Sequence, residues 1–369
     1  MVISAFILAT QAPLNWLPTN VIWSIEDVQA LSILLALLVA CMAPLDFLGG
    51  YCLPRRVNRL SVKPAAFFAS WCRGVTVQAT FFMAASLLIL ALGRWSGVQA
   101  ATGGVLLIAL LLVASQLKIG QLTGDLRPLR ELQESESERM NDAMRSIVQL
   151  GFNPPEVVLL SHRDAGFTGG VVGLPGLEEI ALPVGLVHGL TPEQLAVTVA
   201  RRQQAMHDGS RTRGILVALT WVVIGFLLST LIPGAGVKSV AELAMTCLGF
   251  TLWTFAGLLI LPTLSRQASF ALDTQIVNRG TSPATLHRTM SKLDRLQDDE
   301  PERAAMIEAI FHPVPSVQRR TGKSAVATPI AWHAARMTLF LSWACMGILV
   351  RAVHCNVGRP ELWVMLPTD

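Results

Sequence analysis

The sequence predicts a mainly α-helical, polytopic membrane protein with about six transmembrane helices and an α+β cytoplasmic domain that a transmembrane hairpin interrupts. Composition is the first observation. The 369 residues are 52% hydrophobic and 15% charged, and the mean hydropathy is +0.51, which is too apolar for an ordinary soluble domain. The second is a series of apolar runs long enough to cross a bilayer, separated by two polar stretches. The third is that Lys and Arg gather in alternate loops, as the positive-inside rule requires.

The first third of the chain is predicted to hold an extracytoplasmic segment and three transmembrane helices. Residues 1–27 contain no Lys or Arg, so we expect this segment and the N-terminus outside the cytoplasm. Residues 28–117 supply the three helices. The loop 49–73 is expected to be cytoplasmic because it has no acidic residue and carries the basic residues Arg55, Arg56, Arg59, Lys63 and Arg73.

The rest of the chain alternates between polar and apolar stretches. Residues 118–213 and 262–328 form the two halves of the cytoplasmic domain, and residues 214–261 form the hairpin between them. Residues 329–369 are expected to hold a sixth transmembrane helix near 337–350 and a tail. The apolar run 337–350 is short for a membrane span, so the alternative is an interfacial or buried helix. Both polar halves fall on one side, so they can pack together. We expect an integral protein of a bacterial inner (plasma) membrane.

Charge and cysteine content exclude several classes of function. The net charge of +4 is mild and lacks basic blocks interleaved with aromatic residues, so no nucleic-acid partner is expected. The cysteines show no paired spacing such as C-x-x-C, and we expect buried thiols rather than metal ligands or disulfides. They are Cys41, Cys52, Cys72, Cys247, Cys345 and Cys355.

The first polar stretch has a definite order of elements. A charged helix is expected over 129–150, followed by a strand over 156–160. A glycine-rich passage, 166–176, and a second strand, 180–184, come next. A capped helix then begins near Leu190, with Thr191 as N-cap and Pro192 at the first helical position.

That helix carries a family resemblance. The phrase Leu190 to Ala200 (LTPEQLAVTVA) resembles the helix that leads into His-Glu-x-x-His in the HtpX-like membrane zinc metalloproteases, which include the CaaX prenyl proteases. In this chain the two His positions hold Arg201 and Ala205, and the Glu position holds Arg202. A zinc protease needs two imidazoles at i and i+4 and a carboxylate that activates water, and none of the three is present.

The second polar stretch continues the resemblance. Residues 265–273 (SRQASFALD) are similar to the family's Ser-Arg-x-x-Glu-x-x-Ala-Asp, with Ser269 in place of the Glu that is the third zinc ligand, and with Asp273 kept. A closing motif, His312, Pro313 and Arg319, is similar to the family's His-Pro-Pro…Arg. The resemblance covers about 118–320 and implies a gluzincin-like domain whose zinc site is lost.

Two interpretations of the central arginines remain open. Asp273, or a nearby carboxylate such as Glu193, could pair with Arg201 or Arg202, so that a guanidinium replaces the missing cation. Alternatively, both arginines face solvent. The histidines His188, His207 and His312 are interpreted as hydrogen-bonded or exposed rather than as metal ligands.

The glycine-rich passage has a functional and a structural interpretation. The family resemblance places Phe167, Gly169 and Gly170 at an edge along which a peptide could add as a strand. The passage lacks a Lys-Ser/Thr ending or a complete G-x-G-x-x-G, so a phosphate site is not expected. A simple hairpin bend is the favoured alternative.

These observations predict a catalytically silent membrane metallopeptidase-like protein that needs no cofactor. Its expected partners are the lipid bilayer and membrane proteins or unfolded polypeptide segments, and it would serve as a binding or scaffold module for such proteins or for a membrane protease complex. The alternative is an active zinc metalloendopeptidase with a non-standard site or one completed by a partner. A transporter or channel ranks lowest, because the predicted spans contain few polar groups.

Overall fold

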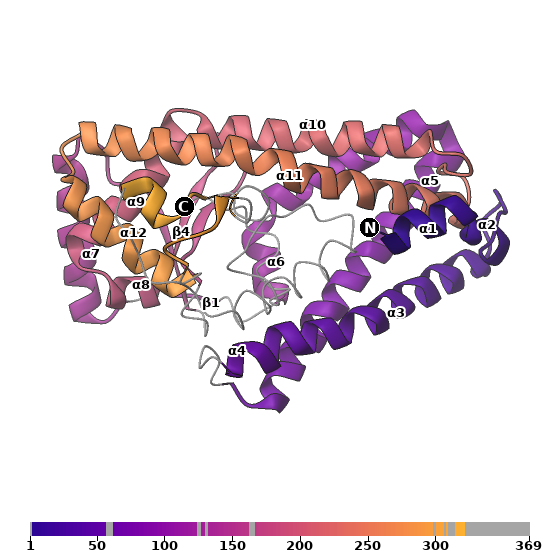
Figure 1. The fold of residues 1–369 in the computed structure, drawn as a ribbon, viewed down its shortest axis with the longest axis horizontal. Helices are drawn as coiled ribbons and strands as arrows, with labels where there is room; N and C mark the ends of the chain where they lie inside the picture. Colours follow the sequence, from indigo (N-terminus) through magenta and orange to yellow (C-terminus); the bar gives the residue numbers. More distant parts are fainter. Residues whose placement is uncertain are drawn as a thin grey trace.

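The computed structural model describes residues 2–56, 62–123, 127–129, 132–161, 167–297, 300–305, 308 and 314–321. The predicted sixth transmembrane helix near 337–350 lies outside the described residues, as do His312 and Pro313. Figure 1 shows a mainly helical molecule with the small sheet near one end and the N-terminal helices near the other. Helices α1 and α2 span Val2–Thr10 and Ala12–Trp16.

Three of the described helices are long and apolar enough to cross a membrane: α3 (Ile25–Phe47), α5 (Pro64–Ala114) and α10 (Ser210–Thr230). Helix α11 (Val240–Asn278) begins with a shorter apolar run over Val240–Thr254. The chain is therefore an integral membrane protein.

The 51 residues of α5 are not one straight helix. The backbone leaves helical geometry at Ser96 and Gly97, where Gly97 has a φ of 74° that favours glycine. After this break the chain reverses direction. Gly104 lies close enough to Leu92 that an added Cβ would clash with the leucine side chain, and two residues twelve positions apart on a straight helix would be about 18 Å apart. Helix α5 therefore consists of two helical segments that pack against each other.

Side chains cap the starts of two long helices. Ser24 and Asp27 form a capping box at the start of α3, and Ser239 accepts a hydrogen bond from the backbone N of Glu242 at the start of α11. Between the spans lie three short helices, η1 (Leu48–Cys52), α4 (Leu53–Arg56) and α6 (Gln116–Thr123).

The sheet has four strands in the order β1-β2-β4-β3. Strands β2 and β4 are parallel, whereas β1 pairs antiparallel with β2 and β3 pairs antiparallel with β4. Val157 of β2 lies opposite Ile180 of β4. The strand bounds are Arg127–Pro128 (β1), Val157–Ser161 (β2), Gly170–Val172 (β3) and Glu179–Pro183 (β4).

One apolar core joins this sheet to the helices that follow it in both polar stretches. Ile147, Ile180, Leu195 and Ile276 are fully buried members of that core, and their burial drives the two stretches together. We call this unit the sheet domain; its helices are α7 (Glu134–Gln149), α8 (Val184–Gly189), α9 (Pro192–His207), α12 (Pro283–Gln297), α14 (Val317–Thr321) and the C-terminal part of α11.

The structure departs from the predicted elements in three places. Helix α7 begins at Glu134 rather than at 129, because Gln133 is its N-cap and has extended backbone. The glycine-rich passage contains a short strand, β3, in addition to a bend. Helix α11 continues unbroken from the apolar run into the sheet domain, so the predicted boundary at 261 falls inside a helix.

Candidate functional site

Helix α9 brings the positions that the family resemblance equates with a zinc site to the centre of the sheet domain. Thr191 is its N-cap: the hydroxyl accepts from the backbone N of Gln194, and the Gln194 side chain accepts from the backbone N of Thr191. Leu195 and Val199 are fully buried. The helix is therefore held both by its first turn and by its apolar face.

Arg201 forms a buried ion pair across the interface between α9 and α11. Its Nε donates to Oδ1 of Asp273 at 2.9 Å, and only 1% of Arg201 and 7% of Asp273 is exposed. Glu193, the other carboxylate considered for this pair, lies on the exposed first turn of α9.

A second guanidinium reaches the same carboxylate from α14. Arg320 Nε donates to Asp273 Oδ2 at 2.6 Å, and its Nη2 donates to Oδ1 at 2.7 Å. This bidentate geometry is the strong form of an Arg–carboxylate ion pair. We call Arg201, Asp273 and Arg320 the ionic triad.

The triad sets the charge of its central carboxyl. Burial alone raises the pKa of Asp273, but Arg201 and Arg320 outweigh it and leave that pKa below its usual value. Asp273 is therefore an anion at neutral pH that is shared by two cations.

Arg202 points to the sheet instead of to Asp273. It is fully buried, with Nη2 donating to the carbonyl oxygen of Thr168 at 2.7 Å and Nη1 to that of Ala181 at 3.4 Å. The alternative in which both arginines face solvent is wrong, because the packing of α9 against the sheet and α11 encloses both side chains.

The other two positions named by the resemblance, Ala205 and Ser269, lie one helical turn from members of the triad. Ala205 is one turn beyond Arg201 on α9, and Ser269 is one turn before Asp273 on α11; both are buried. The four positions, 201, 202, 205 and 269, hold two guanidinium groups, a methyl and a hydroxyl. This donor set does not fit zinc, which requires imidazole, thiolate or carboxylate ligands. Within the described ranges no group of three His, Cys, Asp or Glu side chains could hold a metal ion.

The predicted peptide-binding edge is a buried part of the sheet. Phe167 is 3% exposed and Gly170 is buried, while Gly169 has a φ of 81° and lies so close to Ala181 O that a Cβ would clash. Two carbonyls along this edge, those of Thr168 and Gly173, accept bonds from Arg202 and Arg211. A peptide adding here would have to displace those arginines.

His188 and His207 lie in the last turns of α8 and α9. His188 is half-exposed and contacts Glu136 at 2.5 Å, and His207 is exposed near the end of α9.

Arg320 was not predicted from the sequence as a partner of Asp273. The sequence motif singled out Arg319, whose Nη1 instead pairs with the buried Glu308 at 2.9 Å. Two adjacent arginines on a helix point about 100° apart, so only the rotation of α14 decides which one reaches Asp273. The only signal available in the sequence was the presence of two adjacent arginines, Arg319 and Arg320, either of which could reach a buried carboxylate.

Comparison with known proteins adds information on the fold. Eight chains of solved structures match, among them Ste24p from S. mikatae, with a TM-score of 0.66 and 13% sequence identity over 86% of this chain and 80% of that chain. The fold of this chain is similar to that of Ste24p. No protein-family model and no curated protein matches the sequence.

Proposed function

We propose that this protein is a catalytically silent, metallopeptidase-like membrane protein that acts as a binding or scaffold module for membrane proteins or for a membrane protease complex. The observation that carries the proposal is the ionic triad. Two of its residues, Arg201 and Asp273, lie at positions that the sequence resemblance equates with the family's zinc centre, and their contacts form a guanidinium–carboxylate cluster.

Two properties of the site argue against hydrolysis: its arginines are positively charged, and it lacks the side chains that bind zinc. A catalytic zinc needs three protein ligands and an open position for water. Arginine remains protonated, so Arg201 and Arg202 repel a divalent cation and offer it no lone pair. Asp273, a potential oxygen donor, is already held by Arg201 and Arg320.

Loss of catalysis leaves recognition as the remaining role. The triad joins α9, α11 and α14, and Arg202 joins α9 to β4 and to the segment before β3, so charged contacts rather than a metal hold this part of the domain together. A domain of fixed shape beside membrane helices suits docking on another membrane protein or an unfolded segment. We place it on the cytoplasmic side of a plasma membrane, with the N-terminus outside, from the distribution of Lys and Arg.

The first test is the metal content of the purified, full-length protein together with its proteolysis of an unfolded substrate such as casein. We expect no stoichiometric zinc and no cleavage. The measurement is repeated on complexes captured from membranes, because an enzyme whose site is completed by a partner would gain zinc and activity only there. Zinc at one equivalent with EDTA-sensitive cleavage in either sample would contradict the proposal and support the active peptidase.

The positive control is the combined variant Arg201→His, Arg202→Glu, Ala205→His and Ser269→Glu. Zinc uptake by this variant alone would show that the assay detects a restored site and that the wild-type side chains are what exclude the metal. For the scaffold role, membrane proteins recovered with the wild-type protein are compared with those recovered with an unrelated polytopic protein. Identical sets would contradict a specific binding function.

A further inference from the structure

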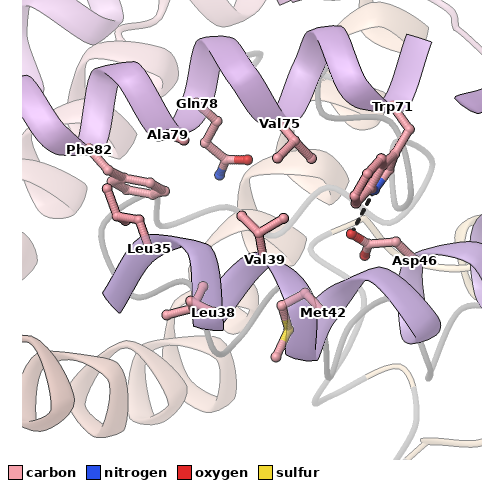
Figure 2. Close-up of a pocket in the computed structure, with 10 residues that line it drawn as sticks. All are labelled: Leu35, Leu38, Val39, Met42, Asp46, Trp71, Val75, Gln78, Ala79 and Phe82. Carbon is pink, nitrogen blue, oxygen red and sulfur yellow. Dashed lines mark hydrogen bonds between the residues drawn. The ribbon is translucent and has the colours of Figure 1, made fainter. Parts of the chain in front are cut away.

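Two polar contacts indicate how far the helix pair α3 and α5 extends across the membrane. Near one end, Arg94 of α5 pairs with Asp27 of α3 at 2.9 Å. Near the other, Trp71 Nε1 donates to Asp46 Oδ2 at 3.0 Å (Figure 2). Asp27 and Asp46 both lie on α3, about 28 Å apart along a helix axis. This length is close to the roughly 30 Å thickness of the hydrocarbon core of a bilayer, so residues just beyond Asp46 lie at the level of the lipid headgroups.

An aromatic cluster lies at this level, where α3 ends and α5 begins. We give this name to Phe47, Tyr51, Phe67 and Phe68. The ring of Phe47 stacks on those of Tyr51 and Phe68, with centroids 5.4 and 5.3 Å apart, and the ring of Phe67 lies 5.2 Å from that of Tyr51. Phe68 is 45% exposed. Aromatic rings at the boundary between hydrocarbon and water are typical of contact with lipid, so the cluster offers an apolar surface to an acyl chain.

Basic side chains adjoin the aromatic cluster from two segments. Arg55 of α4 donates from Nη1 to the hydroxyl of Tyr51, and its guanidinium lies 5.6 Å from the centre of that ring. Lys63 is the N-cap of α5, and its carbonyl accepts from the backbone N of Phe67 at 3.0 Å. Arg55, Lys63 and the neighbouring Arg56 are all exposed.

These three charges lack a counter-charge in the surrounding sequence. Residues 49–73 contain no Asp or Glu, and within the described ranges Arg55, Arg56 and Lys63 form no salt bridge. Arg73, which follows them, is held differently, because its guanidinium donates to two backbone carbonyls of α6 at 2.7 and 2.6 Å. Arg55, Arg56 and Lys63 are therefore available to an external anion.

We propose that Arg55, Arg56 and Lys63 bind the phosphate of an anionic diacyl phospholipid whose acyl chains contact the aromatic cluster. Guanidinium and ammonium groups form charge-assisted hydrogen bonds with phosphate, and Lys and Arg gathered beside a transmembrane helix are typical of binding to anionic lipids. A zwitterionic phospholipid carries its own cation beside the phosphate, so the site selects phosphatidylglycerol over phosphatidylcholine. In the orientation proposed above this lipid lies in the cytoplasmic leaflet, and its binding does not depend on whether the sheet domain is catalytic.

The test is native mass spectrometry of the full-length protein in detergent, with equal amounts of phosphatidylglycerol and phosphatidylcholine that have the same acyl chains. Adducts with phosphatidylglycerol should exceed those with phosphatidylcholine about tenfold. Phosphatidylglycerol should also raise the unfolding temperature, because it binds the folded protein. A large excess of inorganic phosphate should not displace the lipid, because free phosphate has no acyl chain to contact the aromatic cluster.

The combined variant Arg55→Gln, Arg56→Gln and Lys63→Gln should bind the two lipids equally and should lose the rise in unfolding temperature. A matched control removes the same charge from exposed positions elsewhere in the described chain: Arg145→Gln, Arg213→Gln and Arg288→Gln. This control should keep the wild-type preference. Because all of these side chains are exposed, both combined variants should unfold near the wild-type temperature without added lipid.

Equal adducts of the two lipids on the wild-type protein would overturn the proposal. An equal loss of preference in the two combined variants would also overturn it, because net charge rather than this site would then select the lipid. Displacement of phosphatidylglycerol by inorganic phosphate would identify a site for soluble anions instead and would contradict the proposal as well.

Discussion

Asp273 is the residue on which the centre of the sheet domain depends. It is one buried carboxylate between two buried or half-buried cations, Arg201 and Arg320. A buried ion pair is weak evidence of net stability, because both charges lose their hydration. Removing one partner is strongly destabilising, because the remaining charge is then buried without an opposite charge beside it.

We predict that Asp273→Ala destabilises the protein by about 3–5 kcal/mol, because it strands both guanidinium groups. Thermal unfolding in nanodiscs measures this change. The control is Glu193→Ala, which removes an exposed carboxylate on α9 and should change stability by less than about 1 kcal/mol. Similar melting temperatures for Asp273→Ala and Glu193→Ala would show that the triad does not support the fold.

The same carboxylate predicts a dependence of stability on acid. The pKa of Asp273 is below its usual value in the folded protein, so its contribution is present above the unfolded pKa of about 3.9 and is lost as pH falls through the folded pKa. We expect Asp273→Asn to lose less stability than the wild type between about pH 4 and pH 2. Parallel unfolding curves for the two proteins over that range would contradict the assignment.

At the scale of helices and loops, one guanidinium joins the segments at the end of the molecule opposite the sheet. Arg94 of α5 makes two bonds to the buried Asp27 of α3, at 2.9 and 3.0 Å. It also donates to the carbonyls of Asn20 and Lys238 and lies over the ring of Trp23. The side chain of Arg94 therefore links the N-terminal segment, α3, α5 and the α10–α11 loop.

We predict that Arg94→Ala destabilises the protein by about 3–5 kcal/mol, because Asp27 is left buried and unpaired. Arg94→Lys should restore only part of this loss, since an ammonium cannot reproduce the planar, forked geometry. Lys238→Ala is the control: only its backbone carbonyl accepts from Arg94, and its side chain is exposed. A full rescue by lysine would mean that charge alone matters at this position.

The contact between α10 and α11 depends on a close approach at Gly225. A Cβ there would lie 2.0 Å from Cδ1 of Trp253. That ring cannot easily move, because it stacks on Trp221 at 4.3 Å and its Nε1 donates to Trp221 O.

We predict that Gly225→Ala costs about 1–3 kcal/mol through overpacking. The control, Gly214→Ala, lies in the same helix with nothing within 4 Å of the added carbon, and should be neutral or stabilising by up to about 1 kcal/mol. Equal effects of the two substitutions on thermal unfolding would show that helix propensity, not packing, decides the result.

For the whole molecule, the distribution of Lys and Arg predicts that the sheet domain is cytoplasmic and that the α10–α11 loop is outside. Two leucines of nearly equal exposure test this: Leu177 in the sheet domain and Leu231 at the end of α10 are 77% and 76% exposed. In a cysteine-free background, Leu231→Cys should react with a membrane-impermeant maleimide in intact cells, and Leu177→Cys only after permeabilisation. The reverse pattern would invert the proposed topology.

The sequence predicted most of the secondary structure because that information is local. The capping box of α9 is formed by Thr191 and Gln194, three residues apart, and the observed strands β2 and β4 are each within one residue of their predicted bounds. Strand β3 was missed because Gly170–Val172 is held by pairing with β4 rather than by its own composition. The continuous α11 was missed because the change from apolar to polar residues at its middle marks a change of environment, not the end of a helix.

The amino-acid sequence by itself determined the membrane character of the protein and the side chains present at positions 201, 202, 205 and 269, because hydropathy and ligand chemistry belong to residue types. Only the tertiary structure decided how those side chains are used. Arg201 and Asp273 are 72 residues apart, and Arg320 lies 47 residues beyond Asp273, so their meeting depends on how α9, α11 and α14 pack. Burial of both arginines likewise follows from that packing, since neither residue type nor spacing specifies which side of a helix is enclosed.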